Sequence, residues 1–162
     1  LNYMINMECT KMGFDLNGEN KKGEETYFRA NVWTWRPLWK LVCIETNLSS
    51  EVYEEGSLNN GFLINKKMSK KIYNKLKNID IDKEIKLYNE YLISLPLEDC
   101  NNCKGKGKKN KKDCVVCTNE YSKQDGIPIG KQKNFQTSYF LDKDTFKTFV
   151  KFCKESIGFN IN

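Results

Sequence analysis

The sequence contains no histidine and only two arginines among its 162 residues. The lack of histidine excludes imidazole as a general base, as the partner of a nucleophile and as a metal ligand. No apolar run reaches the roughly 20 residues that a membrane-spanning helix needs, and no signal-peptide core precedes a cleavage site. We therefore expect a soluble, cytoplasmic protein that does not bind a membrane.

The remaining composition is typical of a folded domain. Hydrophobic residues make up 39% of the chain, aromatic residues 12% and charged residues 30%. The formal net charge of +6 is compatible with an acidic partner but does not require one. A chain of this length is expected to form a single globular domain over 12–162, preceded by a flexible N-terminal extension over 1–11.

Hydrophobic periodicity and capping residues predict a mostly helical α+β fold with short strands. Two strands are expected in 13–30 around a turn at 17–20, one at 135–140 and one at 159–161. The 48–64 segment is expected to be mainly loop, with 61–64 re-entering the core. Helices are expected to begin near Thr34, Asn65, Asp80 or Asp82, and Asp142. The second and third of these helices are predicted to pack as a hairpin.

Four of the seven cysteines occur as two tight pairs, Cys100–Cys103 and Cys114–Cys117. Two residues between cysteines let both sulfur atoms reach one ion, and ten residues between the pairs allow a tetrahedron to close. Four thiolates favour one structural Zn²⁺ and leave no open position for a catalytic water. The alternatives are mononuclear iron on the same ligands and four unligated thiols. We predict a zinc knuckle inserted at 98–118.

The segment between the two pairs is rich in lysine and cannot fold without the metal. Its lysines either offset the charge of the zinc–thiolate centre or contact phosphates or an acidic protein. These residues are Lys104, Lys106, Lys108, Lys109, Lys111 and Lys112.

The first pair continues as Cys100-x-x-Cys103-x-Gly105-x-Gly107, which resembles one motif of the cysteine-rich domain of DnaJ-type chaperones. The resemblance covers only these eight residues, because no glycines follow the second pair in the same pattern. The His-Pro-Asp tripeptide of a J-domain is absent. We interpret the motif as a shared zinc-knuckle turn, not as evidence of a chaperone.

A second stretch, Tyr27-Phe28-Arg29-Ala30-Asn31-Val32-Trp33-Thr34-Trp35-Arg36-Pro37-Leu38, follows a Met12-Gly13-Phe14-Asp15 start. Together with the tail at 158–161 and the paired cysteines, it resembles a group of small uncharacterised proteins encoded by bacteriophages and prophages. The chain departs from that group at Ala30 and Thr34. The resemblance implies a phage origin and the cytoplasm of a bacterial host, but no activity.

The aromatic residues of this stretch belong either to the core or to a surface that binds a partner. Both arginines of the chain lie here, where bidentate or stacked geometry favours arginine over lysine. The partner-binding hypothesis names Tyr27, Arg29, Trp33, Trp35 and Arg36.

Three classes of function remain. The first, which we favour, is a zinc-stabilised phage accessory protein that binds a host protein, for example as an inhibitor of a defence system such as a CRISPR effector. The second is a nucleic-acid-binding protein that uses the lysine-rich loop. The third is an enzyme, which we do not expect, since no paired-carboxylate or phosphate-binding motif is present. The oligomeric state stays open.

Overall fold

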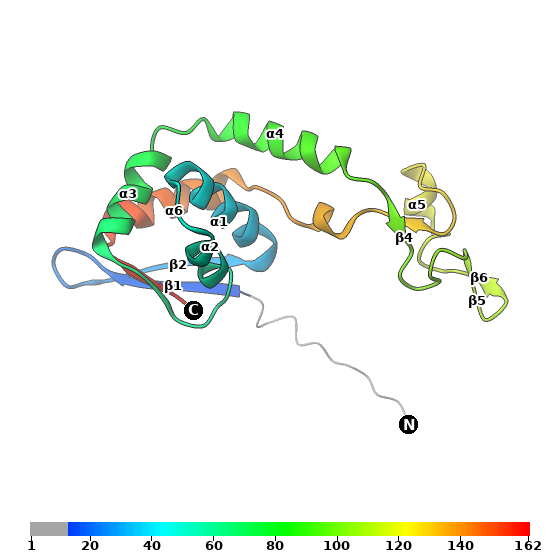
Figure 1. Ribbon diagram of the computed structural model, residues 1–162, viewed down its shortest axis with the longest axis horizontal. Helices are drawn as coiled ribbons and strands as arrows, with labels where there is room; N and C mark the ends of the chain where they lie inside the picture. Colours follow the sequence, from blue (N-terminus) through cyan, green and yellow to red (C-terminus); the bar gives the residue numbers. More distant parts are fainter. Residues whose placement is uncertain (1–12) are drawn as a thin grey trace, which may run out of the picture. The chain divides into compact units, whose positions relative to one another are not determined.

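The computed structural model describes residues 13–162, so the predicted extension over 1–11 lies outside the described residues. The fold is α+β, as predicted. The chain separates into two compact units (Figure 1). The first contains the chain up to Tyr88 and Tyr139–Asn162, and the second is Asn89–Ser138. Within 13–162, every helix is too short or too polar to span a bilayer.

The first unit contains a four-stranded antiparallel sheet in the order β2-β1-β8-β3. Its strands are β1 (Gly13–Glu19), β2 (Glu25–Asn31), β3 (Phe62–Ile64) and β8 (Phe159–Ile161). Alternate residues are buried along each strand, because successive side chains point to opposite faces. Phe14, Leu16 and Phe28 are among the buried residues, whereas Asn17 and Tyr27 lie on the exposed face.

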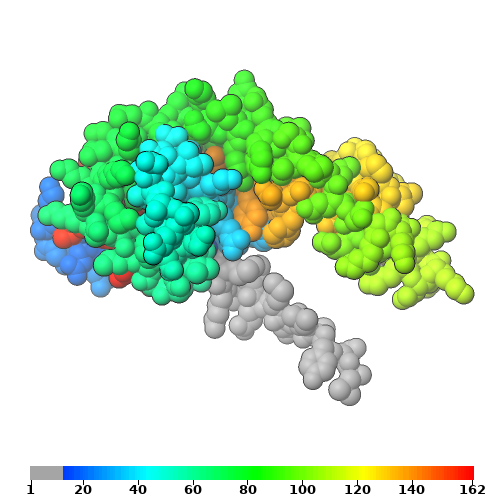
Figure 2. Space-filling model, viewed as in Figure 1, coloured from blue at the N-terminus to red at the C-terminus, as the bar shows by residue number. Residues whose placement is uncertain are grey.

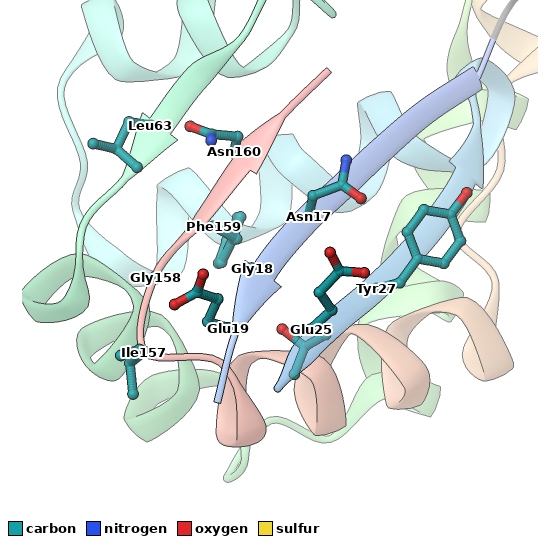
Figure 3. A pocket seen from close by; sticks show the side chains of 11 residues that line it. Asn17, Gly18, Glu19, Glu25, Tyr27, Leu63, Ile157, Gly158, Phe159 and Asn160 are labelled. Atoms are coloured by element: carbon teal, nitrogen blue, oxygen red, sulfur yellow. The ribbon is translucent and has the colours of Figure 1, made fainter. Parts of the chain in front are cut away.

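Helices cover only one face of this sheet (Figure 1). They are α1 (Val32–Thr46), α2 (Ser50–Gly56), α3 (Lys66–Leu76) and α6 (Lys143–Glu155), and α4 (Ile81–Ser94) runs from the first unit into the second. In the space-filling view, α1, α2 and α3 make up most of the visible surface of the first unit (Figure 2). In Figure 3 the sheet is seen from its other face, with α1 passing behind the strands.

The core of the first unit is built from stacked aromatic rings. Trp35 and Trp39 of α1 stack with centroids 5.4 Å apart, and Phe149 of α6 meets Trp35 edge-on at 5.7 Å. Each buried indole needs a hydrogen-bond acceptor, and α2 supplies both. Trp35 Nε1 donates to the Gly56 carbonyl at 2.9 Å, and Trp39 Nε1 donates to the Tyr53 carbonyl at 3.1 Å.

Several predicted helix starts are confirmed. Asn65 caps α3 and Asp142 caps α6, each accepting a backbone N–H three residues on. The predicted cap of α1 is wrong: the cap is Asn31, whose side chain accepts the Thr34 amide at 3.0 Å, so that Thr34 lies inside the helix. An asparagine in extended conformation three residues before a free amide is an equally good N-cap.

Four other predictions are wrong. The turn predicted at 17–20 lies further along the chain, because β1 continues to Glu19 and β2 begins at Glu25. The 48–64 segment contains α2 in addition to loop, whereas the predicted return of 61–64 to the core is confirmed by the buried Ile64 of β3. The predicted helix hairpin does not form, because α3 packs against α6 and α1. The 135–140 segment forms the 3₁₀ helix η2 (Phe135–Ser138) where a strand was expected, since alternation of aromatic residues does not by itself provide a neighbouring strand.

The second unit is made of short elements. It contains β4 (Glu98–Asp99) paired with β7 (Lys131–Gln132), the hairpin of β5 (Lys108–Lys109) and β6 (Lys112–Asp113), and α5 (Glu120–Gln124). The cysteine pairs flank the β5–β6 hairpin. The predicted insert at 98–118 lies inside this unit, which extends further on both sides.

Candidate metal centre

The side chains of Cys100, Cys103, Cys114 and Cys117 meet at one point in the second unit. Their four Sγ atoms all lie within 4.8 Å of one another, and each residue is buried. The Cys100–Cys114 and Cys103–Cys117 sulfur pairs are both 3.8 Å apart. A tetrahedron of sulfur atoms with metal–sulfur bonds of about 2.3 Å has edges of about 3.8 Å. The four predicted ligands are therefore arranged so that they could hold a metal ion.

None of the four is oxidised to a disulfide. Each cysteine pair lies in a tight turn whose nearby donors point at sulfur. The Gly107 amide donates to Cys103 Sγ at 3.2 Å, and the Asn102 side-chain amide donates to Cys114 Sγ at 3.2 Å. Such donors stabilise thiolate charge and orient the ligand atoms.

Gly130 completes the cluster from a part of the sequence that the cysteine motif does not include. Its amide lies 3.4 Å from Cys117 Sγ, and its carbonyl accepts the Cys100 amide at 2.7 Å. Its φ is +87°, and a Cβ atom at this position would lie 2.2 Å from the Gly105 carbonyl oxygen. Only glycine fits there. Sequence reasoning identified the loop over 126–130 but not this role.

No protein-family model matches the chain, and no curated protein or solved structure is similar to it. The site is therefore defined by its own geometry.

Hydrogen bonding lowers the pKa of one cysteine of the cluster, whereas burial raises the pKa of another. The Cys117 amide, followed by the Asn102 side chain, lowers the pKa of Cys114 to about 6. Burial raises the pKa of Cys117 to about 12. Metal binding requires deprotonated cysteines, so a cysteine that still carries its proton releases it when a cation binds.

The cysteines are also the only core of the second unit. Among its residues, 89–138, the buried side chains of apolar character are the four cysteines, whereas the large buried Trp, Phe, Leu and Ile side chains all lie in the first unit. A segment of this size without an apolar core needs a cross-link or a metal to hold its fold. The cluster thus occupies the place that a hydrophobic core has in a larger domain.

The predicted phosphate-contacting or acidic-partner-contacting lysines all lie on the segment between the cysteine pairs. Within the described residues none of the six forms an ion pair, and Lys109 donates to the Asn102 side chain at 2.8 Å. Lys111 follows Asn110 in the β5–β6 turn, where both are exposed and have positive φ. The turn therefore presents lysine to solvent on a short, ordered hairpin.

The residues of the partner-binding hypothesis do not gather at one place. Tyr27 and Arg29 lie on the exposed sheet face around Asp15: the Tyr27 hydroxyl donates to the Asp15 carboxylate, which lies 3.6 Å from the Arg29 guanidinium. The hydrogen bond to Asp15 raises the pKa of Tyr27.

The other three residues are on α1. Trp35 is 0% exposed and belongs to the core, so its assignment to a binding surface is corrected. Trp33 packs on the Tyr139 ring at 5.2 Å, and Arg36 lies 5.9 Å from the same ring and 3.4 Å from its hydroxyl. The shared contact is Tyr139 of the same chain, which anchors the end of the segment leading into α6.

Proposed function

We propose that the second unit is a structural zinc module that holds one Zn²⁺ on four thiolates. The observation that carries the proposal is the buried cluster of four sulfur atoms at tetrahedral spacing. Zinc accepts four thiolates in closed tetrahedral sites, and such sites stabilise folding without activating water. Iron on the same ligands is the competing assignment.

Elemental analysis of the purified protein tests this assignment. We expect about one zinc per chain. The double variant Cys103→Ser/Cys114→Ser should lose the metal. Cys43→Ala is the matched control, because Cys43 is a buried thiol outside the cluster, and it should keep full zinc content. A coloured protein with stoichiometric iron would contradict the choice of zinc but leave the ligands intact.

We further propose that the metal-braced unit is a recognition module for a protein partner. Large apolar side chains are exposed close to the ligands in sequence: Val115 is 78% exposed, Tyr121 78% and Ile129 70%. Exposed large aliphatic and aromatic side chains are typical of surfaces that bind other proteins. Following the phage resemblance, we place the partner among host proteins, including components of defence systems.

The exposed lysines favour a second candidate, a nucleic-acid partner. Six lysines in nine residues, free of ion pairs within 13–162, would release counterions on binding a phosphate backbone. Nucleic-acid binding through these lysines predicts an affinity that falls steeply as the salt concentration rises. Replacing Val115 and Tyr121 should leave that affinity unchanged.

Affinity capture from the host with matched variants separates the two. The wild-type protein should retain a host protein after nuclease treatment of the lysate, and Val115→Asp/Tyr121→Ser should lose it. Replacing the six lysines by glutamine should reduce this capture only in part. Capture that disappears with nuclease, together with salt-sensitive binding of random-sequence DNA or RNA, would transfer the proposal to nucleic acid.

A further inference from the structure

Strand β2 (Glu25–Asn31) is the outermost strand on one side of the sheet, next to β1 (Figure 3). All seven of its residues pair with β1 in an unbroken register. In the described part of the chain, the backbone groups of residues 26–30 have no hydrogen-bonded partner other than β1. Among residues 13–162, the outer edge of this regular seven-residue strand is therefore unpaired.

Long, regular edges invite another strand, and proteins usually block them with proline, a bulge or a covering segment. β2 contains neither proline nor bulge. Beside it lies an open groove of about 620 Å³ between β2, the β1–β2 turn and α6. A second strand can therefore approach this edge.

The side chains of β2 indicate which strand fits. Glu25, Tyr27 and Arg29 lie on the same exposed face, with the two opposite charges placed symmetrically about Tyr27. Antiparallel pairing of β2 with another β2 about Tyr27 sets each Glu25 opposite the Arg29 of the other copy. Opposite charges facing each other across strands are stabilising, and a two-fold interface requires this kind of self-complementarity.

The charges that line the groove favour a second copy of this chain rather than a strand of another protein. A groove lined by charges of a single sign would repel its own copy, but this groove contains both positive and negative side chains. Its charged residues are Lys21, Lys22, Lys151 and Lys154, with Glu24, Glu25 and Glu155.

We propose that the protein forms a two-fold homodimer through antiparallel pairing of its β2 edges centred on Tyr27, which continues the sheet across both chains. The proposal does not depend on the metal centre or on its partner. Tyr27 of each copy lies at the axis, and each Arg29 keeps its own Asp15 on the inner side.

Charge reversal gives a test with an internal rescue. The wild-type protein should sediment as a concentration-dependent dimer in analytical ultracentrifugation. Glu25→Lys sets lysine opposite arginine twice, and Arg29→Glu sets glutamate opposite glutamate twice. Each variant alone should weaken dimerisation about tenfold or more. Mixed one to one, they should form a heterodimer, because both pairs are then complementary.

Recovery in the mixture also shows that both variants are folded. Thermal unfolding by circular dichroism provides an independent check, since Arg29→Glu also loses its ion pair with Asp15. A wild-type chain that stays monomeric at high concentration would overturn the proposal, including the case in which another protein's strand uses this edge. The proposal would also be overturned if the charge-reversal variants dimerised as strongly as the wild-type protein. It would equally be overturned if the two variants folded but did not associate when mixed.

Cysteine cross-linking tests the register. In a Cys9→Ser background, Tyr27→Cys should give a disulfide-linked dimer on mild oxidation, because facing residues of adjacent antiparallel strands have Cα atoms about 5 Å apart. Asn17→Cys is the matched control: Asn17 is exposed and faces Tyr27 from one strand further in, so its two copies lie about 14 Å apart. Equal cross-linking of both variants would rule out the Tyr27-centred pairing.

Discussion

At the scale of single residues, the cysteine cluster depends on groups that the cysteine motif does not contain. Gly130 accepts a hydrogen bond from the Cys100 backbone and donates one to the Cys117 sulfur. It thereby joins the two ligand pairs through the chain that returns after them. Its positive φ and its contact with Gly105 leave no space for a side chain.

Gly130→Ala should therefore weaken metal binding. Gly126→Ala is a close control, because Gly126 has φ +66° but no atom within 4 Å of the position that a Cβ would take. In the control, the free energy of metal binding should become less favourable by about 1–2 kcal/mol, because alanine disfavours the left-handed backbone. Gly130→Ala adds a backbone clash, so its loss of metal-binding free energy should be clearly larger. Competition with a metal chelator measures both affinities, and equal losses would show that the Gly130 contact is unimportant.

Sequence reasoning identified the four cysteines of the cluster but not this glycine, and the reason is distance along the chain. The cysteines are recognisable by local spacing, which a metal requires directly. Gly130 acts only after the loop over 126–130 has folded back. The same limit explains Trp35: three tryptophans in seven residues give no sign of which one the sheet will bury, and Trp33 and Trp35 differ only in the face of α1 they occupy.

At the scale of elements, α6 carries much of the first unit's core and is fixed by its cap. The Asp142 carboxylate accepts the Thr145 hydroxyl at 2.6 Å and the Thr145 amide at 2.7 Å. These bonds, the hydroxyl contributing most, lower the pKa of Asp142. Phe146 and Phe149 follow within two turns and are buried, so the cap holds the start of a core helix.

Asp142→Ala should reduce the free energy of unfolding by about 0.5–1 kcal/mol at pH 7, and Asp142→Asn should cost less because its amide oxygen still accepts. A lowered folded pKa means that the contribution is present above the unfolded value near 4 and is lost as the pH falls through the folded pKa. The difference between wild type and Asp142→Ala should therefore shrink in acid. Urea unfolding across a pH range from about 2 to about 7 checks this.

The exposed carboxylate in the same turn provides the control. Asp144 accepts no cap hydrogen bond from the α6 backbone in the described structure, so Asp144→Ala should change stability by only about 0.3 kcal/mol through the helix dipole. A cost equal to that of Asp142→Ala would assign the effect to charge alone.

The helices that begin after Asn65 and Asp142 could be predicted from their N-cap residues and from apolar residues at helical spacing, since both signals are local in sequence. The elements that failed depend on partners distant in sequence. Residues 50–56 form a helix that accepts two indole N–H groups from α1, a need that no local pattern indicates. Residues 135–140 have strand-like alternation but no strand to pair with among the described residues.

At the scale of the whole molecule, the two units have cores of different kinds. The first unit buries aromatic and aliphatic side chains between a sheet and its helices. The second buries four cysteines and no large apolar side chain among residues 89–138. Hydrophobic burial therefore stabilises the first unit, whereas the second has only its cysteine cluster as a core and, if the proposed zinc site is correct, depends on the metal.

Removal of the metal should consequently unfold one unit and spare the other. After treatment with a strong chelator, backbone amides around the cysteines, such as those of Cys100, Cys114 and Gly130, should exchange with solvent orders of magnitude faster, because they are protected only by bonds within that unit. Amides in α1 and α6 should keep their protection, since their core contains no metal ligand. Hydrogen exchange measured by mass spectrometry distinguishes the two sets of peptides.

Re-addition of zinc should restore the protection of the amides around the cysteines, which separates metal loss from irreversible damage. If chelation leaves residues 98–132 protected, the hydrogen bonds and short hairpins of the second unit are sufficient for its fold; if it exposes α1 and α6 as well, the metal supports the whole molecule.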